Sequence, residues 1–411
     1  MVPFLFLSFF YTDCRIRVMF TRYKTDSKGR NIPVAKVYTQ NEHPICNSQI
    51  DKDALWVIRR IQANGEKAYI VGGAIRDLML GKAPKDFDIA TSASPKQIQR
   101  LFWNSRIIGR RFKIVHIFFN NKIIEVTTFR SDEENFEEGN NNIFGTMEQD
   151  SHRRDYSINS LYYNPQDGHL IDFNNSLEDF KKKRIRSLIP LSFSFKEDPV
   201  RMVRAIKYEC TTGFSLSLGV KIAIFRFHSA ISGVSTSRLT DEFMKILSSG
   251  YSAPIILELA KYKLLPLIAP CMSLYIKYDS FIRDLKELDQ RIKESRHAGL
   301  KDIQISEMIS FLSRSVIVLP EVHHSYDELR REVFRQIKVL LAPLTPPNYE
   351  IERAAELILE FLGHKNRKKS AQRKKNLKNN RTQTKKPKKK VTPQAKTQEV
   401  AANSAAEAHD M

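Results

Sequence analysis

Two aspartates separated by a single residue, Asp86 and Asp88, suggest the first piece of chemistry in the sequence. If residues 86–89 form a strand, both carboxylates point to one face while Phe87 and Ile89 point to the core. Carboxylates this close repel each other unless a cation lies between them, and hard oxygen ligands suit Mg²⁺. On its own, the pattern is more typical of two aspartates on a solvated strand edge.

A glycine pair about a dozen residues upstream favours the metal interpretation. Gly72 and Gly73 follow residues 69–71, an apolar run suited to a buried strand. Because glycine has no Cβ, its backbone N–H can approach phosphate oxygens closely. Arg76 and Asp77 then begin a short predicted helix. Together the two patterns predict a metal-dependent phosphate site.

A third carboxylate, Glu125, lies in a predicted hairpin. The β-rich runs 113–119 and 122–129 are joined by two asparagines, which tolerate the positive φ of a tight turn. Glu125 faces away from the apolar side of its strand, so it could approach Asp86 and Asp88 across the sheet and complete a two-metal site. From the residues alone, a charge on an exposed strand face explains Glu125 equally well.

Two charged segments further along precede predicted helices. Arg153, Arg154 and Asp155 stand before apolar residues at helical spacing, and Asp155 suits the N-cap. A second helix begins after Asp198 at a proline and ends at a glycine. Taken singly, such charges are ordinary, because an ion pair four residues apart contributes only a few tenths of a kcal/mol. The charged residues of interest around the second helix are Glu197, Asp198, Arg201 and Arg204.

Composition narrows the class of partner. The chain has 411 residues, a formal net charge of +21 and a pI near 9.7. This charge predicts a polyanionic partner, either nucleic acid or an anionic membrane surface. The four cysteines (Cys14, Cys46, Cys210 and Cys271) are widely spaced, which indicates free thiols and a cytoplasmic protein without a disulfide framework or a zinc site. The apolar start is too short to span a membrane.

The pattern of elements predicts five parts. Because the globular pattern begins near residue 51, we expect translation to start at Met19 and the preceding 18 residues to be absent from the native protein. The predicted parts are a flexible extension (1–50, with 20–50 as an extended arm), a mixed α/β head (51–186), a helical neck (187–260), a helical body (261–364) and a disordered basic tail (365–411).

The tail is the strongest charge feature. Residues 365–390 hold 14 Lys or Arg and no acid, so we expect this segment to be disordered and to hold nucleic acid through its phosphates, without sequence preference. Attachment to a membrane surface is the alternative. The cations predicted to bind nucleic acid are Lys368, Lys369, Arg373, Lys374, Lys375, Lys388, Lys389 and Lys390, with Arg110 and Arg111 in the head.

Taken together, these motifs resemble the class II nucleotidyltransferases, the family of bacterial poly(A) polymerases and CCA-adding tRNA nucleotidyltransferases. The resemblance covers roughly residues 51–250. The family's glycine element corresponds to Gly72, Gly73, Arg76 and Asp77, with Ile75 in place of valine; its metal-binding aspartates correspond to Asp86 and Asp88, its RRD motif to Arg153, Arg154 and Asp155, and its EDxxR motif to Glu197, Asp198 and Arg201.

The resemblance implies a fold and a reaction. The fold is α+β, with a DNA polymerase β-like mixed α/β head followed by an all-helical neck and body. Two Mg²⁺ ions on the paired aspartates would activate an RNA 3′-hydroxyl for attack on ATP, and Glu125 would help to orient the metal or the hydroxyl. Gly72, Gly73 and Arg76 would hold the triphosphate. Asp155, Asp198 and Arg201 would face the incoming base.

One stretch favours a subgroup. Residues 107–116 look like the short signature that marks the poly(A) polymerases, and a long basic tail is also typical of that subgroup. We interpret His116, within this stretch, as a packed strand residue and not a ligand. The alternatives are a CCA-adding enzyme, which adds two C and one A, and a non-catalytic RNA-binding adaptor. The expected partners are RNA 3′ ends and RNA-decay proteins, and the expected state is a monomer. Deleting the basic tail (365–411) should raise the KM for RNA more than it changes turnover.

Overall fold

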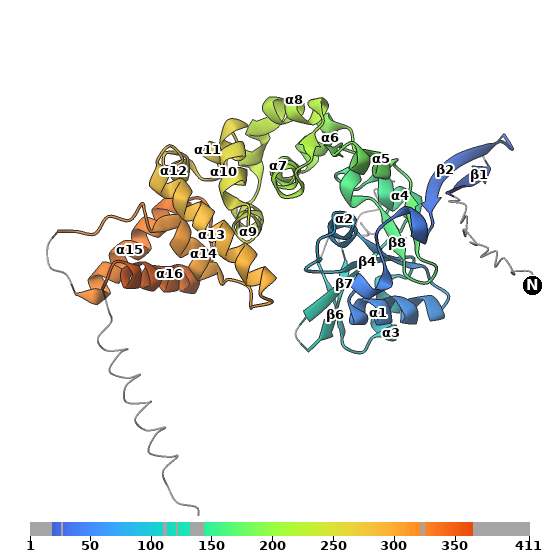
Figure 1. The fold of residues 1–411 in the computed structure, drawn as a ribbon, viewed down its shortest axis with the longest axis horizontal. Coiled ribbons are helices and arrows are strands. Elements are labelled where there is room, and N and C mark those ends of the chain that lie inside the picture. The colour runs from blue at the N-terminus through green and yellow to red at the C-terminus, as the bar shows by residue number, and fades with distance from the viewer. Residues whose placement is uncertain are drawn as a thin grey trace, which may run out of the picture.

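The computed structural model describes residues 19–25, 28–109, 113–120, 122–131, 144–321 and 325–364. These form a mixed α/β head, from which an arch of helices leads to a helical body (Figure 1). The predicted α+β class, with a mixed head before a helical neck and body, is confirmed. Cys46, Cys210 and Cys271 are free thiols, while Cys14 lies outside the described residues.

The head is built on a nine-stranded sheet of order β1-β2-β9-β8-β3-β4-β7-β6-β5. Neighbouring strands are antiparallel except β4 and β7, which are parallel. The strands are β1 Phe20–Thr25, β2 Asn31–Tyr38, β3 Ala68–Val71, β4 Asp88–Thr91, β5 Ser105–Ile108, β6 Ile114–Phe119, β7 Lys122–Thr128, β8 Tyr162–Asn164 and β9 His169–Asp172. A separate parallel pair joins β10 (Arg184–Ile185) to β11 (Ser215–Leu216).

Strand pairing arranges side chains in rows across the sheet, and successive rows face opposite sides. One row, which we call the carboxylate row, passes through every strand of the sheet. Its members, in sheet order, are Phe20, Val37, Ile171, Tyr162, Val71, Asp88, Glu125, His116 and Arg106. The adjacent row, which includes Ile70, Ile89 and Val126, enters the main core beneath helices α1 (Lys52–Ala63) and α3 (Pro95–Leu101).

Local sequence signals explain the head helices. Asp51 caps α1 by accepting from the backbone N–H groups of Asp53 and Ala54, at 2.9 and 3.2 Å. Ser94 caps α3 in a capping box, with a proline in the first turn. The short helix α2 (Gly73–Met79) follows the glycine pair directly. Capping and periodicity therefore predict these elements correctly.

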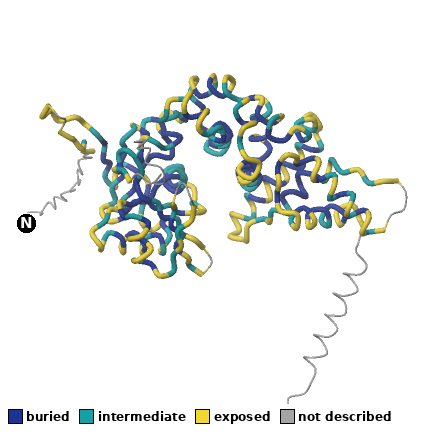
Figure 2. Tube along the Cα trace, turned by 180° about the vertical axis from the view of Figure 1, so that it is seen from behind, coloured by how far each residue is buried: buried dark blue, intermediate teal, exposed yellow. Residues whose placement is uncertain are grey.

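The prediction of a flexible arm over residues 20–50 is wrong for the described residues. β1 and β2 form a hairpin, and Lys36, Val37 and Tyr38 of β2 pair with β9. The outer part of the hairpin is exposed (Figure 2), but Val37 and Ile45 are fully buried. The sequence signal is weak because β2 gains its stability from a strand more than a hundred residues away in the chain.

A second correction concerns the residues after Asp155. The predicted helix is absent, because α4 (Met147–His152) precedes this position and a 3₁₀ turn (Ser157–Asn159) leads into β8. Nearly every residue here is buried, so the apolar spacing carries no helical period. Tyr162 and Tyr163 pair instead with β3 and β9, where aromatic side chains fit well.

The rest of the chain is helical. α7 (Val200–Thr212) ends at Gly213, whose φ of 72° is the left-handed conformation that glycine adopts without strain. No helix in the described ranges is long and apolar enough to cross a membrane. The other helices are α5 Ser176–Lys181, α6 Leu191–Glu197, α8 Leu218–Phe227, α9 Thr236–Leu247, α10 Ser252–Lys261, α11 Leu265–Ile268, α12 Pro270–Ser273, α13 Asp279–His297, α14 Ile305–Ser313, α15 Tyr326–Leu341 and α16 Asn348–Phe361.

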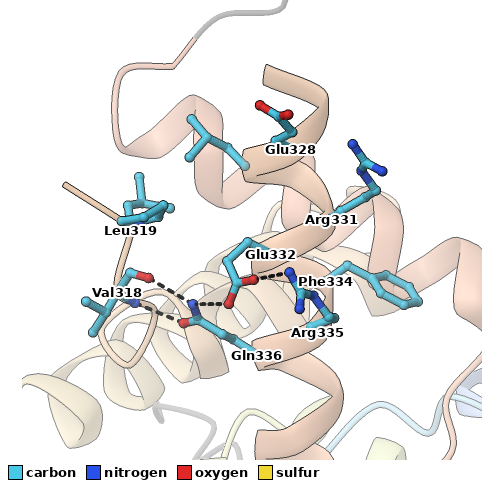
Figure 3. A pocket seen from close by; sticks show the side chains of 10 residues that line it. Val318, Leu319, Glu328, Arg331, Glu332, Phe334, Arg335 and Gln336 are labelled. Atoms are coloured by element: carbon cyan, nitrogen blue, oxygen red, sulfur yellow. Dashed lines mark hydrogen bonds and ion pairs between the residues drawn. The ribbon is translucent and has the colours of Figure 1, made fainter. Parts of the chain in front are cut away.

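The body contains a cavity of about 880 Å³ beside α15 (Figure 3). Val318 and Leu319 form one wall, and Glu328, Phe334 and Gln336 of α15 form the other. The Gln336 side chain donates to the Val318 carbonyl and accepts from its N–H, at 2.8 and 3.0 Å. These bonds tie the loop to the helix, so the cavity belongs to the packing of the body.

Candidate active site

Two carboxylates meet at the centre of the sheet. Asp88 at the start of β4 stands directly beside Glu125 of β7 in the parallel ladder, so both side chains share a face. Phe87 and Ile89 are buried in the core, as the predicted alternation requires. Asp86 lies just before the strand and is exposed. The sequence-predicted carboxylates Asp88 and Glu125 are therefore brought together, with Asp86 two residues away.

The charge of this cluster is concentrated. Burial, together with the negative charges of Glu125 and Asp86, raises the pKa of Asp88 to about 6, while the positive charge of Arg154 opposes this rise. In the described residues, no group of three or more His, Cys, Asp or Glu converges tightly enough to form a complete metal site. The donor chemistry nevertheless fits Mg²⁺, because these hard oxygen donors repel one another and a cation between them removes that repulsion.

At Gly72 the backbone lies close to both an acidic and a basic side chain. Its φ is 70°, and a Cβ at this position would stand 3.5 Å from Asp88 Oδ2 and 3.5 Å from Arg154 Nη1. A side chain there would fill the space between the carboxylate and the guanidinium. The absence of a Cβ keeps this space open for an anionic group such as a phosphate.

Arg154 is held in place by three partners. It donates through Nε to the Tyr162 hydroxyl at 3.1 Å, through Nη1 to the Asn159 carbonyl at 3.2 Å and through Nη2 to Asp150 Oδ2 at 3.2 Å. The Tyr162 hydroxyl donates to the same Asp150 oxygen at 2.6 Å. The guanidinium beside Gly72 is thus fixed by its neighbours. The preceding Arg153 is half-buried at the end of α4.

A second group of predicted residues gathers around the start of α7. Arg201 pairs through Nη1 with Glu197 Oε2 at 2.8 Å, and its Nε lies 3.9 Å from Asp198 Oδ2. Asp198 Oδ1 accepts from the Val200 N–H at 3.2 Å, which gives it the helix-starting role predicted from the sequence. Arg238 of α9 pairs with Asp198 Oδ2 at 2.5 Å. The structure therefore brings Glu197, Asp198 and Arg201 together.

Asp155 differs from its predicted role as a residue facing the base. Its side chain is only 8% exposed, and Oδ1 accepts from the Tyr156 N–H at 2.8 Å and from Asn159 Nδ2 at 3.1 Å. Its other oxygen, Oδ2, pairs with Arg204 Nη2 at 2.9 Å. Because the carboxylate is buried and engaged, it is positioned to orient Arg204 and not to accept from a base.

Five residues form a closed set of contacts between α2 and α7, which we call the bridging cluster. Arg76 donates to Asn159 Oδ1 at 3.1 Å, and Asn159 contacts Asp155, which pairs with Arg204. Arg204 donates to the Tyr208 hydroxyl at 2.9 and 3.3 Å. The cluster closes where the Arg76 guanidinium lies 5.0 Å from the centre of the Tyr208 ring.

The sequence does not single out Asn159 or Tyr208. The one available signal is that Tyr208 stands four residues after Arg204 on a predicted helix, a spacing at which side chains meet. Asp77 pairs with Arg76 at 2.8 Å, on the side of α2 nearest this cluster. The cluster joins the glycine element to the helix that carries Arg201.

His116 is a half-buried strand residue, as predicted, and its Nε2 lies 3.4 Å from Glu125 Oε1. The two residues are neighbours in the carboxylate row. Arg110, Arg111 and the predicted tail cations lie outside the described residues, as do residues 1–18 and 132–143.

Comparison with protein families identifies two segments of the chain. Residues 68–186 match the poly A polymerase head domain. Residues 213–275 match a domain described as a probable RNA and SrmB-binding site of polymerase A. The first segment contains the carboxylates, Gly72 and Arg154. The second begins where α7 ends.

Similar individual proteins include a poly(A) polymerase and a CCA-adding enzyme. Poly(A) polymerase I of Escherichia coli O6:H1 is 37% identical over 292 residues, which are 68% of this chain and 63% of that protein. The CCA-adding enzyme of Geobacillus thermodenitrificans is 33% identical over 224 residues, 53% of this chain and 55% of that protein. The chain thus spans less than two thirds of the length of either relative.

Among solved structures, the CCA-adding enzyme of Bacillus stearothermophilus in complex with CTP resembles this chain with a TM-score of 0.52. The match covers 76% of this chain and 82% of that chain at 23% identity. At this level of identity, the likeness shows a shared fold.

Proposed function

We propose that this chain, whose residues 68–186 match the poly A polymerase head domain, is a template-independent poly(A) polymerase. It adds AMP from ATP to RNA 3′-hydroxyl ends and releases pyrophosphate. The observation that carries the proposal is the pairing of Asp88 with Glu125 beside Gly72 and Arg154. The greater identity and coverage of the poly(A) polymerase relative support poly(A) addition over CCA addition.

The catalytic half of the site is formed by head residues. Asp86 and Asp88 would hold two Mg²⁺ ions, which would lower the pKa of the 3′-hydroxyl and neutralise charge on the reacting phosphate. Glu125 shares the face of Asp88 and orients the attacking hydroxyl. The space at Gly72 admits the triphosphate, and the fixed guanidinium of Arg154 offsets its charge. Arg76 and the Gly73 backbone border the same space.

The base is selected at the start of α7. A carboxylate there accepts from an exocyclic amine, and a guanidinium donates to a ring nitrogen, so adenine and cytosine can satisfy the pair while uracil and guanine fit less well. Asp198 and Arg201 have the right chemistry and lie together. Arg204, held by Asp155 and Tyr208, connects this pair to the head.

RNA is held by the region after α7, by the body and by the basic tail through phosphate contacts that weaken with salt. The enzyme works in the cytoplasm as a monomer, in RNA 3′ processing and decay, together with decay proteins. The high net charge and the RNA-binding domain support this assignment.

A primer-extension assay tests the proposal. The purified protein is given Mg²⁺ and either a generic RNA or a tRNA lacking its 3′ end, with ATP alone, CTP alone or both. We expect long A tracts on both RNAs with ATP alone. Addition of two C and one A, restricted to the tRNA, would identify a CCA-adding enzyme instead. Binding of RNA without any addition would support a non-catalytic adaptor.

A further inference from the structure

The carboxylate row continues beyond Glu125 to two basic side chains. His116 of β6 is paired with Glu125, and Arg106 of β5 is paired with His116. Cross-strand partners share a face, so both lie on the same side of the sheet as Asp88. Arg106 is exposed, and none of the acidic side chains in the described residues forms an ion pair with it.

The spacing of strands sets the reach of these residues. Neighbouring strands are about 4.8 Å apart, so the Arg106 backbone lies roughly 10 Å from that of Glu125. An arginine side chain extends over part of this distance along the sheet surface. Arg106 can therefore contact a group that lies one or two nucleotides from the reacting hydroxyl.

The direction from which RNA approaches follows from the reaction, and this step rests on the proposed function. In-line displacement places the attacking hydroxyl and the departing pyrophosphate on opposite sides of the reacting phosphate. Gly72 and Arg154, which border the triphosphate space, lie at the β3 and β8 side of Asp88. The attacking hydroxyl therefore arrives over β7, β6 and β5.

We propose that Arg106 and His116 form a subsite for the last two internucleotide phosphates of the RNA primer. The Arg106 guanidinium presents a planar set of donors that matches phosphate oxygens. His116, with its Nε2 at 3.4 Å from Glu125 Oε1, fills the surface between the carboxylates and Arg106 and guides the strand across it. The subsite holds the strand whose 3′ end leads toward Asp88.

The first test compares two arginine variants. Arg106→Gln removes the charge at the subsite, whereas Arg100→Gln removes the same charge from exposed α3 on the opposite face of the sheet. We expect Arg106→Gln to raise the KM for RNA about tenfold, with the KM for ATP and kcat unchanged. Arg106→Lys should restore the KM for RNA only in part, because lysine keeps the charge but not the planar set of donors. An RNA KM equal to that of Arg100→Gln would overturn the proposal.

The second test probes the contact itself. Primers are compared whose last two internucleotide phosphates are native or uncharged methylphosphonates, with 2′-deoxyribose at the nucleotide preceding each linkage in both primers. Loss of the phosphate charge should weaken binding to the wild type about tenfold but add little to Arg106→Gln, because both changes remove one contact. If the substitution and the uncharged phosphates instead weaken binding independently, so that their fold-losses in affinity multiply, then Arg106 contacts the primer elsewhere or not at all.

Fluorescence anisotropy with these primers measures RNA binding independently of primer extension, so the subsite and the reaction are tested separately. A wild type that binds the native primer through Arg106 but never extends it with any nucleotide would contradict the proposed function and support the subsite. A wild type that extends the primer with ATP, and whose affinity is unchanged by Arg106→Gln, would contradict the subsite alone.

Discussion

At the scale of single residues, burial and neighbouring carboxylates disfavour the ionised form of Asp88. Its pKa is raised from 3.8 to about 6 by burial and by the nearby carboxylates. Below about pH 4 the Asp88 carboxyl is neutral, and its contribution to the stability of the folded protein is fully present. As the pH rises through about 6 the carboxyl ionises in the folded protein, and this contribution is lost. At neutral pH, the ionised side chain therefore destabilises the protein when no cation is bound.

Asp88→Asn should consequently raise the melting temperature in EDTA at pH 7, by about 2 °C or more, because it removes an ionised carboxylate from beside Glu125. Thermal unfolding followed by fluorescence measures this, and the gain should shrink as the pH falls toward 4. Asp51→Asn is the matched control. The pKa of Asp51 is lowered despite its burial, through its bond to Lys122, so that substitution should reduce the melting temperature. A lower melting temperature for Asp88→Asn at pH 7 would contradict the repulsion described here.

At the scale of elements, the bridging cluster couples α2 to α7. Arg76 belongs to the glycine element, while Arg204 and Tyr208 belong to the helix that follows Asp198. Two elements that are more than a hundred residues apart are thus held in one geometry. Under the proposed function, this coupling would let a single preorganised site bind both the triphosphate and the base.

Tyr208→Phe tests this coupling with the loss of one oxygen atom. The variant keeps the aromatic ring beneath Arg76 but removes the acceptor for two donors of Arg204. We expect the KM for ATP to rise on the order of tenfold with little change in the KM for RNA, since a hydrogen bond to a charged group contributes about 1.5–3 kcal/mol.

Tyr262→Phe is the control for Tyr208→Phe, because it removes a buried tyrosine hydroxyl outside the cluster. If both variants bind ATP like the wild type, then the Tyr208 hydroxyl has no part in positioning Arg204. A similar rise in the KM for ATP in both would indicate a general loss of packing in the neck.

Local signals predicted much of the fold, and distant pairings explain what they missed. The caps at Asp51 and Ser94 and the glycine at the end of α7 act over a few residues, so the sequence reveals them. β2 and β8 were missed because their stability comes from pairing with β9 and β3, far away in the chain. Sequence also cannot tell a buried carboxylate from an exposed one, so the burial of Asp155 and its pairing with Arg204 appear only in the structure.

The candidate site shows the same division. Asp88, Glu125 and Arg201 were found because they stand in recognisable motifs. Asn159 and Tyr208 have no motif of their own, and their importance appears only when the fold places them between two arginines. A single sequence therefore reveals candidate reactive residues more readily than it reveals the residues that hold them in position.

At the scale of the whole molecule, head and body meet close to the carboxylates. Lys85, directly before Asp86, pairs with Asp302 of the body at 2.6 Å. A cavity of about 250 Å³ at this junction is lined by Lys85, Lys245, Arg296 and Asp302, among serines and apolar residues. The arch of helices carries the body back toward the head (Figure 1), so a bound RNA would meet Lys245 and Arg296 near the carboxylates.

The central claim is that the carboxylate pair on the head sheet transfers AMP to RNA. The most direct measurement is the rate at which Asp88→Asn extends an RNA primer with ATP and Mg²⁺, compared with the wild type at equal folded concentration. Removing a metal-holding carboxylate should lower the rate about a thousandfold or more while RNA binding persists. A variant that still extends the primer at a rate close to that of the wild type would contradict the assignment of this site.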